Sequence, residues 1–204
     1  MKRAVLVFTA VSAALALAAC QRTDAQPTAD AGTGNDAVNA VQDATSAAVG
    51  TVAATTVGPM TTESFATNAA ISDMYEIQAG RIAQEKGRAA GVREFGQMMV
   101  TDHTNLSETL KPLITAAGVT PPTGLDERRK GLIDNLNAAA PAEFDAVYLG
   151  QQEAAHNEAL MLMENYAERG DNAPLKAAAA KAAPRIRTHL QKVEALRGEP
   201  SSPR

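Results

Sequence analysis

Tryptophan is absent from this 204-residue sequence, and phenylalanine and tyrosine together supply an aromatic content of only 3%. The apolar positions are therefore filled mainly by alanine, leucine, valine, isoleucine and methionine. Sheets favour β-branched and aromatic residues, whereas small and unbranched residues are typical of closely packed helices. The composition predicts an all-α protein, and the length suits one folded domain with appended segments.

Positively charged residues are outnumbered, because the sequence contains 19 Lys and Arg residues and 23 Asp and Glu residues. The resulting net charge of −4, without a basic patch interleaved with aromatic residues, argues against a nucleic-acid partner. Cysteine occurs once, at Cys20, which excludes an intrachain disulfide and a cysteine-rich zinc site. No phosphate-binding glycine loop, nucleophile elbow or HExxH motif occurs. Whether the protein is an enzyme stays open, with the balance against it.

The first twenty residues have the pattern of a secretory signal. Lys2 and Arg3 precede an apolar run, residues 4–19, which is short for a membrane-spanning helix. The run ends in Leu-Ala-Ala-Cys and resembles the bacterial lipoprotein signal, in which cleavage precedes the cysteine and its thiol receives a diacylglycerol. With Gln21 next, the resemblance implies that Cys20 anchors the protein to the outer membrane, facing the periplasm. An ordinary signal peptide and an uncleaved anchor are the alternatives.

The chain divides by composition into a signal, a tether, a folded domain and a tail. Residues 20–60 contain no aromatic residue and are rich in Ala, Thr, Asp and Gly, which predicts a lipidated cysteine followed by a disordered tether. Such a tether would span about 35 Å. The folded domain is expected at residues 61–197, between the signal peptide (1–19) with its tether and a flexible tail (198–204).

Four long helices are predicted in the folded domain, at about 62–87, 89–117, 141–170 and 173–196. A shorter helix at about 125–137 lies in the connection between the second and the third. Pro112 and Pro184 are expected to bend the second and fourth helices. The pattern predicts a four-helix bundle with a short extra helix. The long connection leaves open whether the third helix runs parallel or antiparallel to the second.

Three histidines and one glutamate fall on the buried faces of these helices. His103, His156 and His189 occupy positions of the apolar stripes, and Glu76 lies on a face of small residues. With the predicted limits, Glu76, His103 and His156 lie within about two residues of their helix midpoints, and His189 lies about 6 Å from its own, so the four meet at a similar level. A buried polar group without a partner costs about 1–3 kcal/mol, so the four must satisfy one another or bind something.

Two arrangements would satisfy this polar layer. In the first, Glu76, His103, His156 and His189 ligate one transition-metal ion, with Zn, Fe or Cu as candidates. The side chains expected to support these ligands by hydrogen bonds are Asp102, Tyr148, Gln152 and Glu153. In the second, the same layer is a metal-free hydrogen-bond network in which Glu76 pairs with a protonated histidine. The residues alone leave both arrangements open.

Several of these residues stand in short motifs. They are Glu76-Ile77 with Gly80, Val92-Arg93-x-Phe95, Met99-Val100-x-Asp102-His103, Phe144-Asp145-x-x-Tyr148, Gln152-x-x-x-His156, and Pro184 ahead of His189-Leu190. The set resembles a bacterial family of outer-membrane or secreted proteins, over about residues 63–196. The resemblance implies a ferritin-like four-helix domain of unknown function in the cell envelope.

The sequence departs from the di-iron proteins that share the ferritin-like fold. Those proteins need a Glu-x-x-His motif on each of two helices, and here only Glu153 and His156 have that spacing. A mononuclear site is therefore the better metal hypothesis.

Three functions remain open. The first is a non-enzymatic envelope module that binds a protein partner or a small ligand, in a stress-related role. The second is a metal-binding protein, and the third is an oligomeric structural protein. The missing catalytic motifs favour the first, and the sequence fixes neither the partner nor the oligomeric state.

Overall fold

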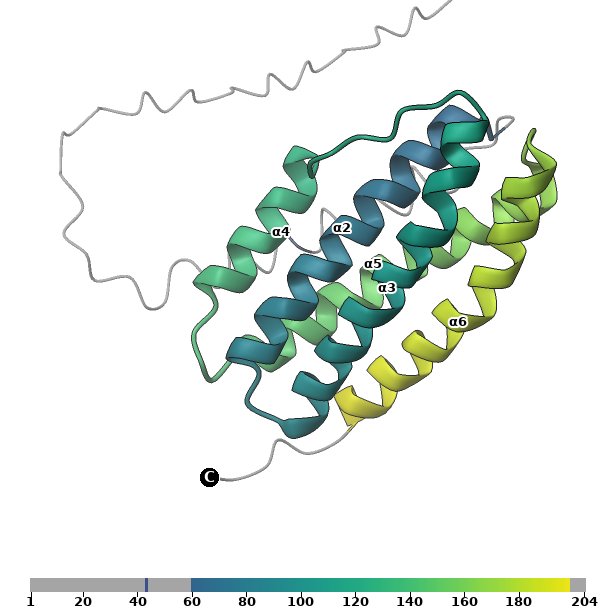
Figure 1. Ribbon diagram of the computed structural model, residues 1–204. Coiled ribbons are helices and arrows are strands. Elements are labelled where there is room, and N and C mark those ends of the chain that lie inside the picture. The colour runs from purple at the N-terminus through teal and green to yellow at the C-terminus, as the bar shows by residue number, and fades with distance from the viewer. Residues whose placement is uncertain (1–42, 44–59, 199–204) are drawn as a thin grey trace, which may run out of the picture. The chain divides into compact units, whose positions relative to one another are not determined.

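The computed structural model describes residue 43 and residues 60–198, and within them it is entirely helical. The helices are α2 (Thr62–Lys86), α3 (Ala90–Ala116), α4 (Glu127–Ala138), α5 (Phe144–Arg169) and α6 (Ala173–Gly198), as Figure 1 shows. The predicted all-α class is confirmed. The helices continue through Pro112 and Pro184. None of the described helices is long and apolar enough to cross a membrane.

The predictions for the two ends of the chain lie mostly outside the described residues. The signal peptide and Cys20 are not described, and of the predicted tether only Asp43 and Met60 are. Met60 packs into the apolar core. Gly198 is the last residue of α6, so the helix extends one residue into the predicted tail.

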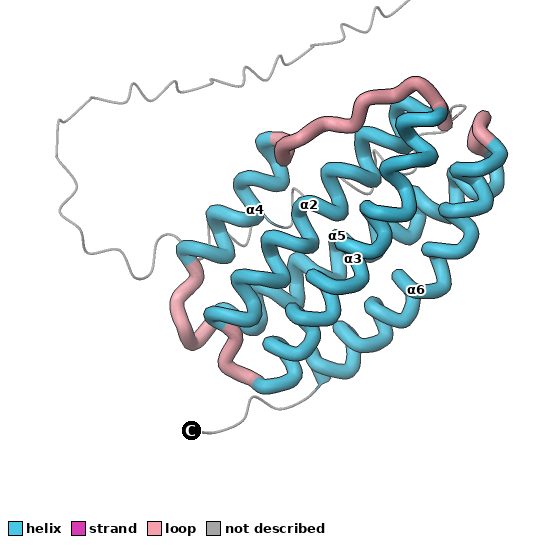
Figure 2. The backbone as a smooth tube through the Cα atoms, in the orientation of Figure 1, coloured by secondary structure: helices cyan, strands magenta, loops and turns pink. Residues whose placement is uncertain are grey.

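Four long helices lie side by side, and α4 lies next to α2 on the outside of that group (Figures 1 and 2). Asp145 at the start of α5 accepts hydrogen bonds of 2.9 Å from the backbone N–H groups of Arg88 and Ala89, just before α3. Helices α3 and α5 therefore begin at the same end and run parallel. The physical reason is the long connection containing α4, which returns the chain to the end where α3 began. Likeness to ferritin remains a prediction.

Side-chain caps and one glycine set several helix ends. The hydroxyl of Thr61 accepts a hydrogen bond from the Ser64 N–H at the start of α2, and the carboxylate of Asp126 accepts one from the Arg129 N–H in α4. Each bond satisfies a backbone donor that has no partner within the helix. Beyond α3, Gly118 adopts a φ of 78°, which only glycine reaches without strain.

Helices α2 and α3 approach each other closely at two glycines. A Cβ atom on Gly80 would lie 2.7 Å from the carbonyl oxygen of Gly96, and one on Gly96 would lie 2.6 Å from that of Gly80. Asp73 lies seven residues before Gly80, and His103 lies seven residues after Gly96. Because the two helices are antiparallel, this glycine contact sets a register that places Asp73 opposite His103.

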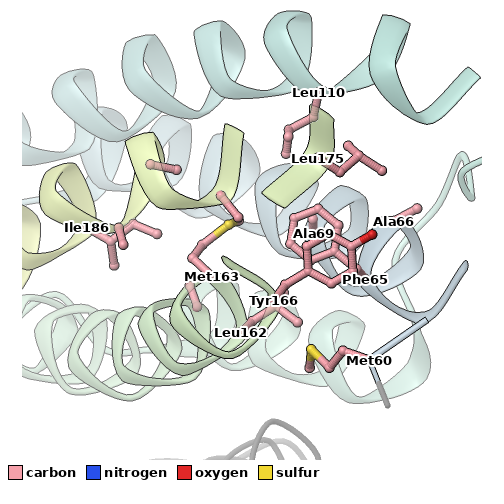
Figure 3. Close-up of a cluster of buried hydrophobic side chains, with 14 of the residues drawn as sticks. Met60, Phe65, Ala66, Ala69, Leu110, Leu162, Met163, Tyr166, Leu175 and Ile186 are labelled. Carbon is pink, nitrogen blue, oxygen red and sulfur yellow. The ribbon is translucent and has the colours of Figure 1, made fainter. Parts of the chain in front are cut away.

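Two apolar clusters fill the bundle, one on each side of a polar layer. The first contains Phe65 and Tyr166, whose rings stack with centroids 3.9 Å apart (Figure 3). The second contains Phe95, Phe144 and Tyr148. Each fully buried aromatic or branched side chain contributes about 1.5–3 kcal/mol, so both ends of the bundle hold the layer between them in place.

Candidate metal centre

Helices α3, α5 and α6 bring three imidazoles together inside the bundle. One ring nitrogen from each of His103, His156 and His189 lies within 4.8 Å of the other two. The three residues are at most 2% exposed. The prediction that three helices present their histidines at one level is confirmed, because the helical period fixes the face and the apolar clusters fix the depth.

Each imidazole also uses its other nitrogen in a hydrogen bond. The three bonds are His103 Nδ1 to Asp73 Oδ1, His156 Nδ1 to the carbonyl oxygen of Gln152, and His189 Nε2 to Asp102 Oδ2, all of 2.8 Å. Carbonyl and ionised carboxylate oxygens only accept, so these outer nitrogens carry the hydrogen. In the neutral rings the inner nitrogens therefore carry lone pairs. Metal-binding histidines have this same outer hydrogen bond.

The inner nitrogens of His156 and His189 face each other at short range. Nε2 of His156 lies 3.2 Å from Nδ1 of His189. Two lone pairs cannot form a hydrogen bond, so this contact requires a proton or another cation between them. Two imidazole nitrogens that bind one tetrahedral zinc ion at 2.0–2.1 Å lie about 3.3 Å apart. The pair already has that spacing.

Protons are held weakly at this pair. Burial, together with the nearby His103, lowers the pKa of His156 to about 3. Burial, together with His156, lowers the pKa of His189 to about 4. Burial also lowers the pKa of His103, but the hydrogen bond and charge of Asp73 outweigh it and raise the pKa overall. Near neutral pH both rings are therefore neutral, and their two facing nitrogens carry no hydrogen.

Asp73 is a part of the site that sequence reasoning missed. It is 2% exposed, and its second oxygen accepts a hydrogen bond of 2.9 Å from Ser107 Oγ. Its place three residues before Glu76 puts it on the same helix face, which is the one sequence signal that points to it. Ser107 donates to this carboxylate, whereas the serine of a catalytic triad is bonded to the imidazole.

Glu76 lies beside the three histidines. It is 1% exposed, and burial raises its pKa. Its Oε2 accepts a hydrogen bond of 2.7 Å from Gln152 Nε2, and its Oε1 lies 3.7 Å from His156 Nδ1. Among the described residues, the ligand atoms that gather within 4.8 Å belong to histidines, so Glu76 is adjacent to that set.

The four predicted supporting residues divide into three groups. Asp102 and Gln152 hold His189 and His156 through the bonds given above. Tyr148 is fully buried, and burial followed by the charge of Glu76 raises the pKa of its hydroxyl well above the usual value. The prediction for Glu153 is not supported, because it pairs with Arg197 outside the layer. Position 153 lies one step away from the helix face that carries the histidine.

Unpaired polar atoms concentrate in this layer. Among the described residues, the buried side-chain atoms without a hydrogen-bond partner are Glu76 Oε1, His103 Nε2, Tyr148 Oη and Gln152 Oε1. Folded proteins pair nearly all such atoms with protein, water or ions. Two of the four belong to predicted metal ligands, which fits a bound ion at this level.

A groove reaches two of the three histidines. It lies between α3 and α6, encloses about 300 Å³, and is lined in part by Asp102, His103 and His189. Lys181 and Arg185 also line it, and Arg185 Nη2 lies 3.5 Å from Asp102 Oδ1. The groove offers a route by which an ion or small molecule reaches the layer.

The comparisons with known proteins identify a family but no individual relative. No curated protein and no solved structure matches the chain. A family profile matches residues 44–196, a range that includes all five described helices except the last two residues of α6. The resemblance to a helical family of unknown function is thereby confirmed. The chain belongs to the family described as a domain of unknown function, DUF4142.

Proposed function

We propose that this protein is an envelope-anchored helical bundle that binds one transition-metal ion through His103, His156 and His189. The observation that carries the proposal is the 3.2 Å separation of the inner nitrogens of His156 and His189. Two unprotonated nitrogens at that distance repel each other unless a cation binds both. Zn, Fe and Cu are the candidates, because imidazole suits these ions.

Glu76 is proposed as the fourth ligand. The three histidines come from α3, α5 and α6, and α2 supplies Glu76. Its Oε1 has no hydrogen-bond partner, and a buried ionised carboxylate is costly unless it meets a positive charge. A bound cation would stabilise the ionised form of Glu76 and would complete a four-coordinate site.

The metal-free network is the second candidate for this layer. The raised pKa of His103 favours it, because a protonated His103 would offset the charges of Asp73 and Glu76. It leaves the facing nitrogens of His156 and His189 without a hydrogen between them. A metal ion bound to both nitrogens would remove their repulsion, whereas a proton on His103 would not. The metal site is therefore the better proposal.

The envelope location rests on the sequence around Cys20, outside the described residues. We expect the full-length chain, expressed in a bacterial host, to incorporate radiolabelled palmitate and to fractionate with the outer membrane. Cys20→Ser should lose the label and leave the membrane. Retention of the label in this variant would contradict the lipoprotein proposal. In the envelope, the bundle would hold or pass on its ion without catalysing a reaction.

The metal proposal is tested by elemental analysis of the full-length chain, purified without chelator and without a polyhistidine tag. One equivalent of Zn, Fe or Cu per chain is expected, and His156→Gln should lose it. Thr188→Ala, an exposed change beside His189, is the matched control and should keep it. A metal-free protein that takes up none of these ions when they are added would overturn the proposal.

A further inference from the structure

A second cavity lies between α2, α4 and α5, and encloses about 440 Å³. Its wall includes the side chain of Asp43, which belongs to the segment ahead of the bundle. We propose that this cavity is a binding site for a small carboxylic acid with an apolar body, and that the carboxylate of Asp43 occupies its polar end. This site is independent of the metal proposal.

Two buried amides bind the Asp43 carboxylate, one at each oxygen. Asn135 Nδ2 donates to Oδ1 at 2.6 Å, and Gln151 Nε2 donates to Oδ2 at 2.9 Å. Asn135 is 5% exposed and Gln151 is 4% exposed. Hydrogen bonds to a charged acceptor are about twice as strong as neutral ones, so this pair of donors selects a carboxylate.

The amide of Gln151 is held in the orientation that a carboxylate needs. The hydroxyl of Tyr75 donates to Gln151 Oε1 at 2.9 Å, and Gln151 Nε2 also donates to the carbonyl oxygen of Leu132 at 3.2 Å. With its oxygen engaged by a donor, the side chain can present only its NH₂ group to the cavity. The site is therefore built before a ligand arrives, which lowers the cost of binding.

The remainder of the cavity suits an apolar body. Leu132, Val147 and Ala155 line it, and a Cβ atom on Gly150 would meet nothing within 4 Å. Its volume lies within the range of about 300–1,000 Å³ that is usual for small-molecule sites. Three arginines also line the cavity, and each pairs with an acidic side chain. Arg128 and Arg129 pair with Glu158, which lines the cavity too, and Arg197 pairs with Glu153.

Asp43 competes with a free acid because it belongs to the same chain. A group tethered in this way acts at an effective concentration on the order of millimolar, so its removal should raise the affinity for a free carboxylate about tenfold or more. The apolar space beside Asp43 stays open while its carboxylate is bound. A free acid with an apolar body can fill both parts, which Asp43 alone cannot.

The test uses the full-length chain with benzoate as the probe and benzamide as its uncharged counterpart. Binding is followed by the NMR shifts of the side-chain NH₂ groups of Asn135 and Gln151. We expect Asp43→Ala to bind benzoate about tenfold or more tightly than the unaltered chain. Benzamide should not bind. Equal benzoate affinity with and without Asp43, or equal binding of benzamide, would overturn the proposal, as would no saturable shift in Asp43→Ala.

A charge change inside the site gives a second test that keeps the side-chain shape. In the Asp43→Ala background, Asn135→Asp replaces a donor with a like charge and should abolish benzoate binding. Asn157→Asp makes the same chemical change at an exposed position of α5 and should leave it unchanged. Benzoate binding that survives Asn135→Asp, with circular dichroism showing a folded bundle, would contradict the assigned subsite.

Discussion

Nε2 of His156 lies 3.2 Å from Nδ1 of His189, and both rings are almost fully buried. Their outer nitrogens are bonded to a carbonyl oxygen and to a carboxylate, so neither ring can turn its hydrogen inward without losing one of these hydrogen bonds. Leaving one such acceptor unpaired costs about 1–3 kcal/mol. The predictions about the metal centre follow from this contact.

Binding of a metal ion should stabilise the fold. At a free concentration 100 times the dissociation constant, the free energy of unfolding should rise by about 2.7 kcal/mol, because the unfolded chain lacks the assembled ligands. The measurement is urea unfolding of the metal-free chain with and without added Zn²⁺. His156→Gln should show no such increase. An equal increase in this variant would place the ion elsewhere.

Glu76→Gln should weaken metal binding while leaving the metal-free fold at least as stable. Glutamine keeps the size of the side chain and removes a buried group whose pKa is raised by burial, so the metal-free protein loses a costly charge. The metal affinity should fall about tenfold or more, because a charged ligand becomes a neutral one. Competition with a chromophoric chelator measures it. Unchanged affinity would show that Glu76 is not a ligand.

Asp73→Asn should reduce metal affinity about 10- to 100-fold, the usual effect of altering a residue that holds a metal-binding histidine. The variant weakens the bond that fixes the ring of His103 with Nε2 directed inward. Ser107→Ala removes only the second partner of the same carboxylate and should have a smaller effect. Equal effects of both changes would mean that Asp73 acts through general packing.

The stability of the metal-free bundle should fall as the pH drops from about 6.5 towards 4. In the folded state the pKa values of His156 and His189 are about 3 and about 4, whereas an unfolded histidine titrates near 6.5. Between these values the unfolded chain binds more protons than the folded one, so acid favours unfolding. Each histidine contributes up to about 1.4 kcal/mol per pH unit in that window.

Other groups in the layer act in the opposite sense. Burial raises the pKa values of Asp73 and Glu76. At a pH above the pKa that these carboxyls have in the unfolded chain, the folded chain therefore binds more protons there. The raised pKa of His103 affects stability only above pH 6.5, where the folded chain keeps a proton that the unfolded chain has lost. The comparison is therefore made with His156→Gln by urea unfolding at pH 4.5–6.5. Its slope against pH should be shallower by about 1 kcal/mol per pH unit. Identical slopes would contradict the prediction.

Gly96→Ala should destabilise the bundle by about 1–3 kcal/mol, because the new Cβ would lie 2.6 Å from the carbonyl oxygen of Gly80 and would force α2 and α3 apart. Gly150→Ala is the matched control on α5, where a Cβ meets nothing within 4 Å. It should stabilise the helix by about 0.5–1 kcal/mol. Chemical unfolding of both variants measures the difference.

Local patterns in the sequence predicted the helices, the three histidines, and Glu76, Asp102 and Gln152 beside them. A helix repeats every 3.6 residues, so a histidine among regularly spaced apolar residues must share their buried face. The same rule places Glu153 off that face. The sequence therefore determined that imidazoles from three helices enter the interior at one depth.

Contacts between helices decided the rest. The sequence left the direction of α5 open, because a long connection can return the chain to either end. It did not reveal Asp73, whose position opposite His103 depends on the close approach of two glycines on different helices. The meeting of Asp43 with Asn135 and Gln151 is also beyond any local pattern. Spacing along one helix fixes which face a residue takes, and only the packing of helices fixes what that face meets.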